Sequence, residues 1–232
     1  MKAISLPLAS AVAALLIAAC SGANSGEAKT SSPDTASASN STSDEKSSAG
    51  EVSPTDMVIG DPNAPVTIIE YASVTCPGCA SFHERVFPGL KEKFVETGKA
   101  KIVFREFPTP PVEFSMIGSV MARCAAEKGG SEAYFLVINA LFQNQRTWIY
   151  GEDPKAELLK IASQAGMDED TFDACLKRQE LLDAIEARVK EGSEEFDINS
   201  TPSFVLDGKK INARSLEDFE AAINEAIEKE AS

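Results

Sequence analysis

The chain has 232 residues, of which 43% are hydrophobic, and a formal net charge of −14. This length and apolar content are enough for one good-sized core, so we expect one folded domain with room for an insertion. The acidic balance argues against a nucleic-acid partner, which would require a basic face.

The N-terminal quarter of the chain predicts a signal and a tether. Residues 1–19 hold Lys2 and then a continuous apolar run. This run is short for a membrane-spanning helix, which indicates a signal peptide. Residues 17–20 resemble a bacterial lipobox, so we expect Cys20 to become the lipid-modified first residue of a lipoprotein; an ordinary secretory signal is the alternative. Residues 20–55 contain almost no large apolar side chain, which predicts a disordered Ser/Thr-rich tether. We therefore expect the protein on the periplasmic side of the cell envelope, lipid-anchored to a membrane.

An apolar strand then leads directly into two cysteines three residues apart. Residues 66–71 are apolar except for Glu70, as in a strand that is buried on both faces. Cys76 follows at the expected start of a helix, with Pro77 in its first turn, where unpaired N–H groups and the helix dipole favour a thiolate. Cys76 is therefore the candidate nucleophile, and Cys79 is placed to resolve a mixed disulfide formed on it.

A cysteine pair at this spacing has two other uses, a zinc site and an inert structural disulfide. A zinc site would need two further ligands, and the remaining candidates, Cys124, Cys175 and His83, show no second pair at a recognisable spacing. We therefore expect a redox-active pair and no bound metal.

Two titratable residues stand close to the pair in the sequence. Glu70, inside the apolar strand, should lie beneath the cysteines and exchange a proton with Cys79; a glutamate at the sheet end that faces water is the alternative. His83 lies four residues after Cys79 and shares its helix face, so it could tune Cys79 or carry its proton. A partly exposed histidine on the helix flank is the alternative.

The next elements complete a βαβ unit within residues 56–111. The helix that starts at Cys76 should end at Gly98, with a kink at Pro88. Residues 101–107 predict a second core strand, parallel to the first and reached by a right-handed crossover.

The remainder is a helical insertion followed by two strands and a helix. Residues 112–196 show helical periodicity throughout, with Cys124 and Cys175 on apolar faces. In an oxidising compartment we expect these two cysteines to form a structural disulfide; two buried free thiols are the alternative. Residues 197–232 predict a hairpin turned at Asp207 and Gly208, then a final helix.

Three segments together resemble the DsbA-like thiol:disulfide oxidoreductases. They are IGDPNAPVTIIEYASVTCPGC at residues 59–79, FREFP at residues 104–108 and NSTPSFVLDGKKI at residues 199–211. The resemblance implies the α/β class, with a thioredoxin-like fold formed by residues 56–111 and 197–232 and interrupted by an all-helical subdomain. It implies that Cys76 attacks, that Cys79 resolves and that Glu70 is the buried acid of the family. It also implies that Pro202 is a cis-proline and that the backbone of Thr201 pairs with substrate.

The same resemblance implies a monomeric enzyme, without a cofactor, that introduces disulfides into reduced, partly folded secreted proteins. Its reoxidation by a DsbB-like membrane protein is implied by the family only. Two departures leave a reductase or isomerase open as an alternative. Gly78 stands where the best known strong oxidase has histidine, and Thr201 is also seen before the cis-proline in isomerase branches. A Cu(I)-binding module that uses the cysteine pair and a tethered scaffold are the alternatives from other classes.

Overall fold

The structure, a computed structural model, describes residues 50–230. The signal peptide, Cys20 and residues 20–49 of the expected tether lie outside the described residues, so those expectations stay predictions. Residues 51–55, which the sequence places in the tether, instead contact the folded domain: Arg105 donates to the Glu51 carbonyl and Arg188 to the Thr55 hydroxyl.

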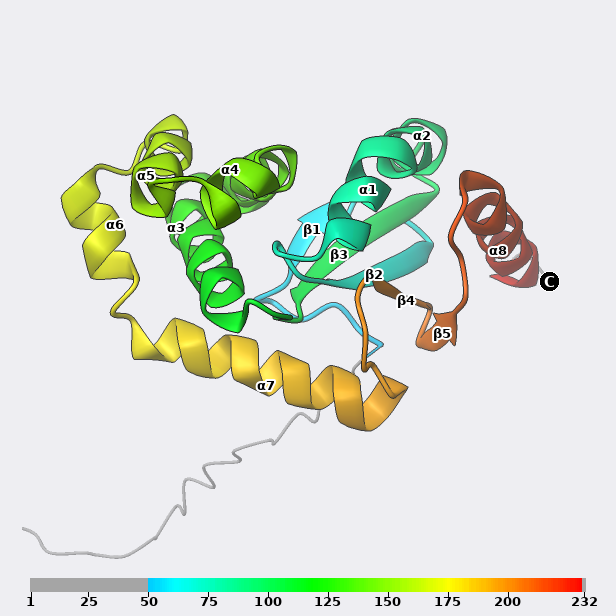
Figure 1. Cartoon of the computed structure of the whole chain (residues 1–232). Helices are drawn as coiled ribbons and strands as arrows, with labels where there is room; N and C mark the ends of the chain where they lie inside the picture. Colours follow the sequence, from blue (N-terminus) through cyan, green and yellow to red (C-terminus); the bar gives the residue numbers. More distant parts are fainter. Residues whose placement is uncertain (1–49, 231–232) are drawn as a thin grey trace, which may run out of the picture. The chain divides into compact units, whose positions relative to one another are not determined.

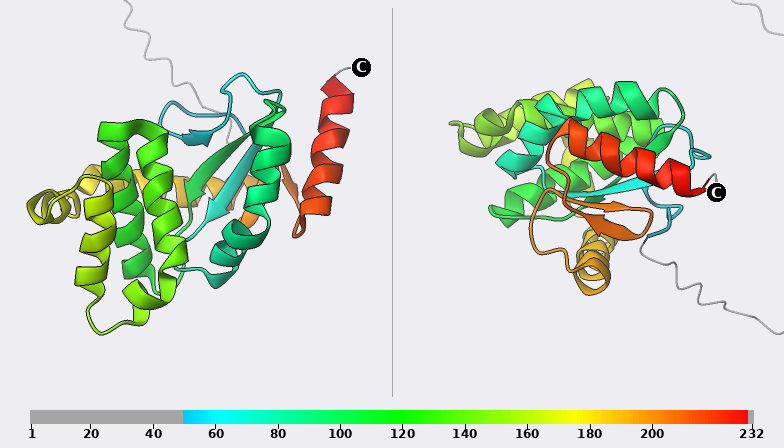
Figure 2. Two further views of the ribbon diagram at one scale, coloured as in Figure 1. Left: turned by 90° about the horizontal axis from the view of Figure 1, so that it is seen from above. Right: turned by 90° about the vertical axis from the view of Figure 1, so that its right-hand side faces the viewer.

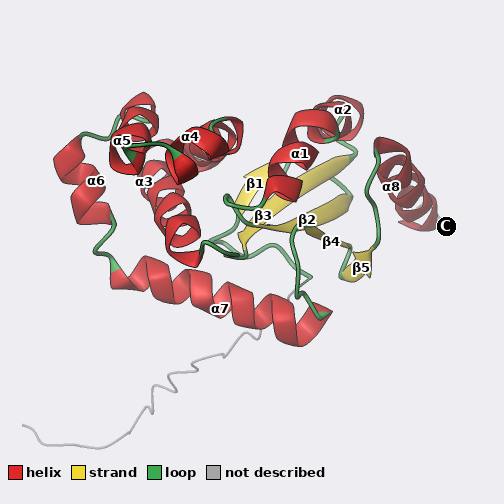
Figure 3. Ribbon diagram, viewed as in Figure 1, coloured by secondary structure: helices red, strands yellow, loops and turns green. Residues whose placement is uncertain are grey.

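A five-stranded mixed sheet forms the centre of the described fold, in the order β1-β3-β2-β4-β5 (Figure 1, Figure 3). The strands are β1 (Met57–Ile59), β2 (Val66–Ala72), β3 (Ala100–Glu106), β4 (Ser203–Leu206) and β5 (Lys209–Ile211). The two central strands, β2 and β3, run parallel, and the other three neighbouring pairs are antiparallel. The central strands are nearly continuous apolar runs because helices cover both of their faces.

The helices fall into three groups around this sheet. They are α1 (Pro77–Arg85), α2 (Phe87–Leu90) with the π-helix η1 (Lys91–Val95), α3 (Val112–Gln143), α4 (Gln145–Tyr150), α5 (Pro154–Gln164), α6 (Glu169–Cys175), α7 (Gln179–Phe196) and α8 (Leu216–Glu230). Helices α1, α2 and α8 pack on one face of the sheet, and α7 runs along the other (Figure 1). Helices α3 to α6 form a subdomain beside the sheet, on the side away from α8 and the β4–β5 hairpin (Figure 2).

The fold is therefore α/β and thioredoxin-like, with an inserted helical subdomain, as the sequence predicts. Among the described residues, no helix is both long enough and apolar enough to cross a membrane.

The helix that begins after Cys76 is divided, which the sequence only partly anticipates. The interruption lies at Val86, whose φ and ψ are −109° and −46°, two residues before the expected kink at Pro88. Proline lacks an N–H and its ring clashes with the preceding turn, so the helix is disturbed ahead of the proline itself. The segment then ends at Gly98, at a positive φ of 69° that favours glycine.

Candidate active site

The two cysteines of the CPGC segment lie at the junction of β2 and α1. Cys76 has extended backbone angles and is the residue before α1, and Pro77 occupies the first helical position. The Cys76 N–H donates to the carbonyl of Ser73 at 3.0 Å, which turns the chain from the strand into the helix. Both cysteines are free thiols; Cys76 is partly exposed, whereas Cys79 is fully buried.

The two thiols differ strongly in acidity. The pKa of Cys76 is lowered from 9.0 to about 5, chiefly by a hydrogen bond from the Cys79 thiol. The side chain of Thr201 and the backbone N–H groups of Cys79 and Gly78 lower it further, whereas burial raises it. Burial raises the pKa of Cys79 well above 9.0, and its hydrogen bond to Cys76 and the charge of Glu70 raise it further. At neutral pH the dithiol therefore carries a thiolate at Cys76 and a protonated thiol at Cys79.

The loop before β4 lies directly against Cys76. The Thr201–Pro202 peptide bond is cis, and the carbonyl oxygen of Thr201 lies 3.3 Å from the Sγ of Cys76, from which it accepts a hydrogen bond in the thiol form. A Cβ placed on Gly78 would lie only 3.3 Å from Cδ of Pro202 and 3.5 Å from that Sγ. The structure thus brings together Cys76, Gly78, Thr201 and Pro202, although 125 residues separate Cys76 from Thr201.

A side chain from the helical subdomain holds the segment between β2 and α1, which carries Cys76. Nε2 of Gln145, at the start of α4, donates to the carbonyl oxygens of Val74 at 2.8 Å and of Cys76 at 3.0 Å. The sequence analysis did not identify Gln145. Its partners are backbone groups about 70 residues away, which leave no local pattern in the sequence.

Glu70 and His83 form a buried pair beneath the cysteines. Nε2 of His83 lies 2.9 and 3.1 Å from the two carboxylate oxygens of Glu70. The imidazole ring stacks on Phe87, with ring centres 4.6 Å apart, and its centre lies 4.5 Å from that of the Phe142 ring. Glu70 is fully buried and the His83 side chain is 5% exposed. The two alternatives, a glutamate that faces water and a partly exposed histidine side chain on the helix flank, are therefore wrong.

The other two cysteines of the described residues form a disulfide. Cys124 of α3 and Cys175 of α6 are bonded, with Cα atoms 6.3 Å apart, and this bond links two helices of the inserted subdomain. In the part of the chain that the structure describes, no three His, Cys, Asp or Glu side chains are grouped so that they could hold a metal ion.

The fold and this site define a thioredoxin-fold thiol:disulfide oxidoreductase domain. Residues 52–225 match the family model described as Thioredoxin. The chain therefore belongs to the thioredoxin family.

Individual relatives agree with this assignment. A Rickettsia bellii protein named as a protein-disulfide oxidoreductase is 30% identical over 173 residues, which are 75% of this chain and 65% of that protein. A Bacillus cereus protein named as a disulfide bond formation protein D is 24% identical and is matched over 76% of this chain and 79% of its own length. The chain spans 63% of the length of the Rickettsia typhi relative and 65% of that from Rickettsia bellii.

Solved structures show that, within this family, the chain is one of the DsbA-like oxidoreductases. The crystal structure of alpha-DsbA1 from Wolbachia pipientis is 30% identical, with a TM-score of 0.68, over 77% of this chain and 96% of that chain. The DsbA of Chlamydia trachomatis, at 22% identity and a TM-score of 0.67 over 79% of this chain and 97% of its own, shares the fold.

Proposed function

We propose that this protein is an extracytoplasmic thiol oxidase that introduces disulfides into secreted proteins through Cys76 and Cys79. The observation that carries the proposal is the contrast between an accessible Cys76 with a pKa of about 5 and a buried Cys79 with a raised pKa. Hydrogen bonds stabilise the Cys76 thiolate, and closure of the disulfide removes that thiolate. The reduced form is thereby favoured, which makes the disulfide form a good oxidant.

The proposed reaction is a pair of thiol–disulfide exchanges. A substrate thiolate attacks the Sγ of Cys76 in the oxidised enzyme, the Cys76–Cys79 bond breaks and Cys79 leaves with its electron pair. A second substrate thiolate then attacks the substrate sulfur of the mixed disulfide, and Cys76 leaves as a thiolate. The substrate loses two electrons and gains a disulfide, and the enzyme becomes a dithiol. The low pKa of Cys76 makes it a good leaving group in the second step.

We propose that the buried pair of Glu70 and His83 delivers a proton to Cys79. Cys79 leaves in a fully buried position, where an anion is unfavourable, so it needs a proton. The charge of Glu70 acts on Cys79, and Nε2 of His83 lies within hydrogen-bond distance of both carboxylate oxygens of Glu70. His83 also lines a cavity of ≈ 410 Å³ between α1 and α3. In this proposal a proton from solvent reaches His83 through the cavity and is passed on toward Cys79.

Thr201 and Pro202 are proposed to position the substrate. Their loop touches the reactive sulfur and presents backbone at the edge of the cleft beside α1. A substrate segment in extended form can pair with the backbone of Thr201 while its cysteine faces Cys76.

The location and the partners are proposals that rest on the sequence of residues 1–55 and on the family. The lipobox-like residues that end at Cys20 support a lipid anchor on the periplasmic side of the envelope. The proposed partners are reduced, partly folded secreted proteins and a DsbB-like membrane protein that restores the Cys76–Cys79 disulfide. We propose a monomer.

The equilibrium of the cysteine pair with a glutathione redox buffer tests this function. We expect a reduction potential above about −180 mV for the full chain. The Cys124→Ser, Cys175→Ser variant, measured in parallel, assigns the potential to Cys76 and Cys79. A potential near about −270 mV would instead indicate a reductase that a partner keeps reduced. Reactivation of a protein with scrambled disulfides, without net oxidation, would indicate an isomerase.

A further inference from the structure

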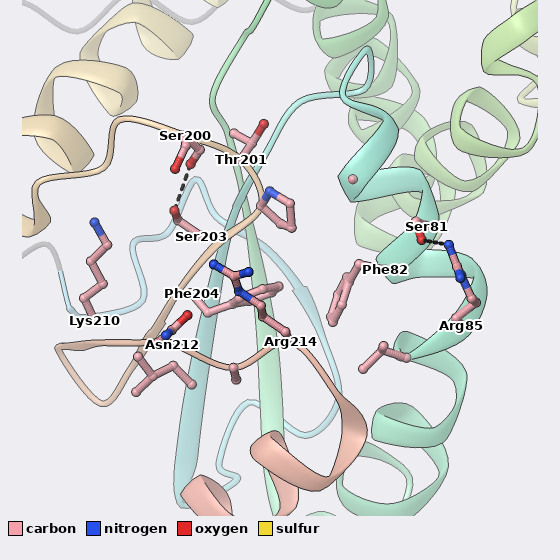
Figure 4. Close-up of a pocket in the computed structure, with 15 residues that line it drawn as sticks. Ser81, Phe82, Arg85, Ser200, Thr201, Ser203, Phe204, Lys210, Asn212 and Arg214 are labelled. Atoms are coloured by element: carbon pink, nitrogen blue, oxygen red, sulfur yellow. Dashed lines mark hydrogen bonds between the residues drawn. The ribbon is translucent and has the colours of Figure 1, made fainter.

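A second cavity, of ≈ 830 Å³, opens directly beside the reactive cysteine. Gly78, Thr201 and Pro202 form the end that it shares with the active site. From there it extends between α1 and the β4–β5 hairpin (Figure 4). Its volume is typical of ligand-binding pockets.

The charged residues that line this cavity are all cations. They are Arg85 on α1, Lys210 on β5 and Arg214 in the loop before α8, and no aspartate or glutamate lines it. In Figure 4, Arg214 lies between the strand that carries Phe204 and the helix that carries Phe82 and Arg85. The whole chain has 36 acidic residues and 22 Lys and Arg residues. A cavity lined by cations alone therefore differs in charge from the chain as a whole.

Neighbouring groups leave these cations available to a ligand. Arg85 donates to the hydroxyl of Ser81, and Lys210 donates to the backbone carbonyl of Asp197 at 2.6 Å. The carboxylate of Asp218 accepts from the backbone N–H groups of Arg214 and Ser215, both at 2.9 Å. Within residues 50–230, none of the three cations forms an ion pair with a carboxylate.

The thiolate does not account for the cations either. Hydrogen bonds from Cys79, Thr201 and Gly78 lower the pKa of Cys76, and no cation is among the principal causes. Three exposed cations that gather around one cavity, with no acid among its lining residues, favour an anion as the ligand of that cavity.

We propose that this basic cavity is a subsite for an acidic side chain of the substrate polypeptide, close to the cysteine that is oxidised. The inference rests on the proposed function and specifies its substrate class. In an extended substrate segment, side chains two residues apart point to the same side. When the substrate cysteine faces Cys76, the residue two positions before or after it faces the cavity. The guanidinium groups of Arg85 and Arg214 match the geometry of a carboxylate.

The subsite would act mainly on the rate of association. A protein of net charge −14 repels acidic segments in general, so a local basic cavity determines where such a segment can approach. Exposed charges of this kind change the association rate and its salt dependence more than the stability of the complex.

The test compares three peptides that have one cysteine each and Glu, Gln or Lys two residues before and after it. The oxidised full chain is mixed with each peptide, and acid-quenched samples give the second-order rate constant for reduction of the Cys76–Cys79 disulfide. We expect the Glu peptide to react roughly tenfold faster than the Lys peptide at low salt, with a smaller ratio at high salt. In an Arg85→Gln, Arg214→Gln variant we expect the Glu and Gln peptides to react at nearly equal rates.

Arg146→Gln is the matched control. Arg146 follows Gln145, the residue that contacts the Cys76 carbonyl, but it does not line the basic cavity. The control variant should keep the preference for the Glu peptide. An equal loss of preference in the control would overturn the subsite, because the effect would then come from the general field of the protein.

A small thiol that bears carboxylates could exploit the same chemistry, so glutathione and cysteamine form a second arm. If the arginine substitutions slow glutathione but leave the peptide ratios unchanged, the cavity binds a small anionic thiol and the polypeptide subsite is wrong. If the wild-type chain oxidises all three peptides at one rate, the subsite is wrong and the proposed function stands. If it oxidises none of them, the proposed function itself fails.

Discussion

His83 places its Nε2 2.9 Å from a carboxylate oxygen of Glu70, in the layer between α1 and β2 and beneath the reactive cysteines. The pair joins the helix that carries Cys79 to the strand that precedes it. Phe87 and Phe142 pack against the imidazole, and Phe142 belongs to the inserted subdomain. The buried acid and the insertion are therefore coupled through one histidine.

Substitution of Glu70 by glutamine should make Cys79 more acidic. Burial raises the pKa of Cys79 first, and the Glu70 charge adds to it, so loss of the charge removes a part of the shift. The rate of Cys79 alkylation against pH, measured in a Cys76→Ser background, reports this pKa. An unchanged pH profile for Glu70→Gln would contradict a role of Glu70 at Cys79.

His83→Phe keeps an aromatic ring between Phe87 and Phe142 but leaves the buried Glu70 carboxylate without its partner. We therefore expect the free energy of unfolding to fall by about 1–3 kcal/mol. In the Glu70→Gln, His83→Phe double variant we expect part of this loss to be recovered. A double-mutant cycle from denaturant unfolding measures the coupling. Additive effects would show that the two side chains do not interact.

The pH dependence of stability should differ between the reduced and the oxidised protein. In the reduced protein the folded state holds Cys76 at a pKa of about 5, below the ordinary value of 9.0. The stabilisation from this group is fully present above pH 9 and is lost as the pH falls through 5. The oxidised protein has no such group, so reduction should stabilise the fold more at pH 7 than at pH 4. Unfolding midpoints of both forms at the two pH values check this, and a difference that does not change with pH would exclude a Cys76 thiolate.

Local patterns in the sequence predicted the elements, because each depends on neighbours in the chain. Continuous apolar runs, helical periodicity and the glycine at position 98 predicted the βαβ unit, and the spacing of Cys76 and Cys79 predicted the redox pair. The cis bond before Pro202 was expected only through the family resemblance, since the same residues also fit an ordinary strand start.

Contacts across long distances in the sequence were not predictable in this way. Gln145 reaches the Cys76 loop from 69 residues away, and the ring of Phe142 that covers His83 belongs to a helix that starts beyond β3. The basic cavity combines residues of α1 with residues after β5. Such sites depend on which elements the topology brings together. The local patterns of one sequence predict the elements but not which of them become neighbours in space.

Gly192→Ala in α7 should destabilise the protein, although alanine favours a helix by about 1 kcal/mol over glycine. A Cβ at this position would lie 2.6 Å from Cε1 of the buried Tyr71 ring, and overpacking of this kind costs about 1–3 kcal/mol. Lys190→Ala, at an exposed position of the same helix, is the control and should change stability little. Equal or higher stability of Gly192→Ala in denaturant unfolding would show that α7 can move away from the sheet.

Asp56 fastens the start of the folded domain, and its replacement by alanine should cost about 3–5 kcal/mol of unfolding free energy. Its fully buried carboxylate pairs with Arg105 of β3, at 2.9 Å, and with Arg188 of α7. Arg105 also donates to the backbone carbonyl of Glu51 at 2.7 Å, and Arg188 donates to the hydroxyl of Thr55 at 2.6 Å. Residues 51–56 are thus held against the sheet by two arginines that share Asp56 as an ion-pair partner.

The cost arises because Asp56→Ala leaves two guanidinium groups buried with fewer partners, and a buried charge that has lost its counter-charge is strongly unfavourable. Lys93→Gln, which breaks the exposed pair between Lys93 and Glu220, is the control and should change stability little. Denaturant unfolding of the two variants measures the difference. The contact of Arg105 with Glu191 remains in Asp56→Ala, so an additional Glu191→Gln substitution should lower stability further. If Asp56→Ala unfolds at the same denaturant concentration as the wild-type chain, residues 51–56 are not fastened by this acid.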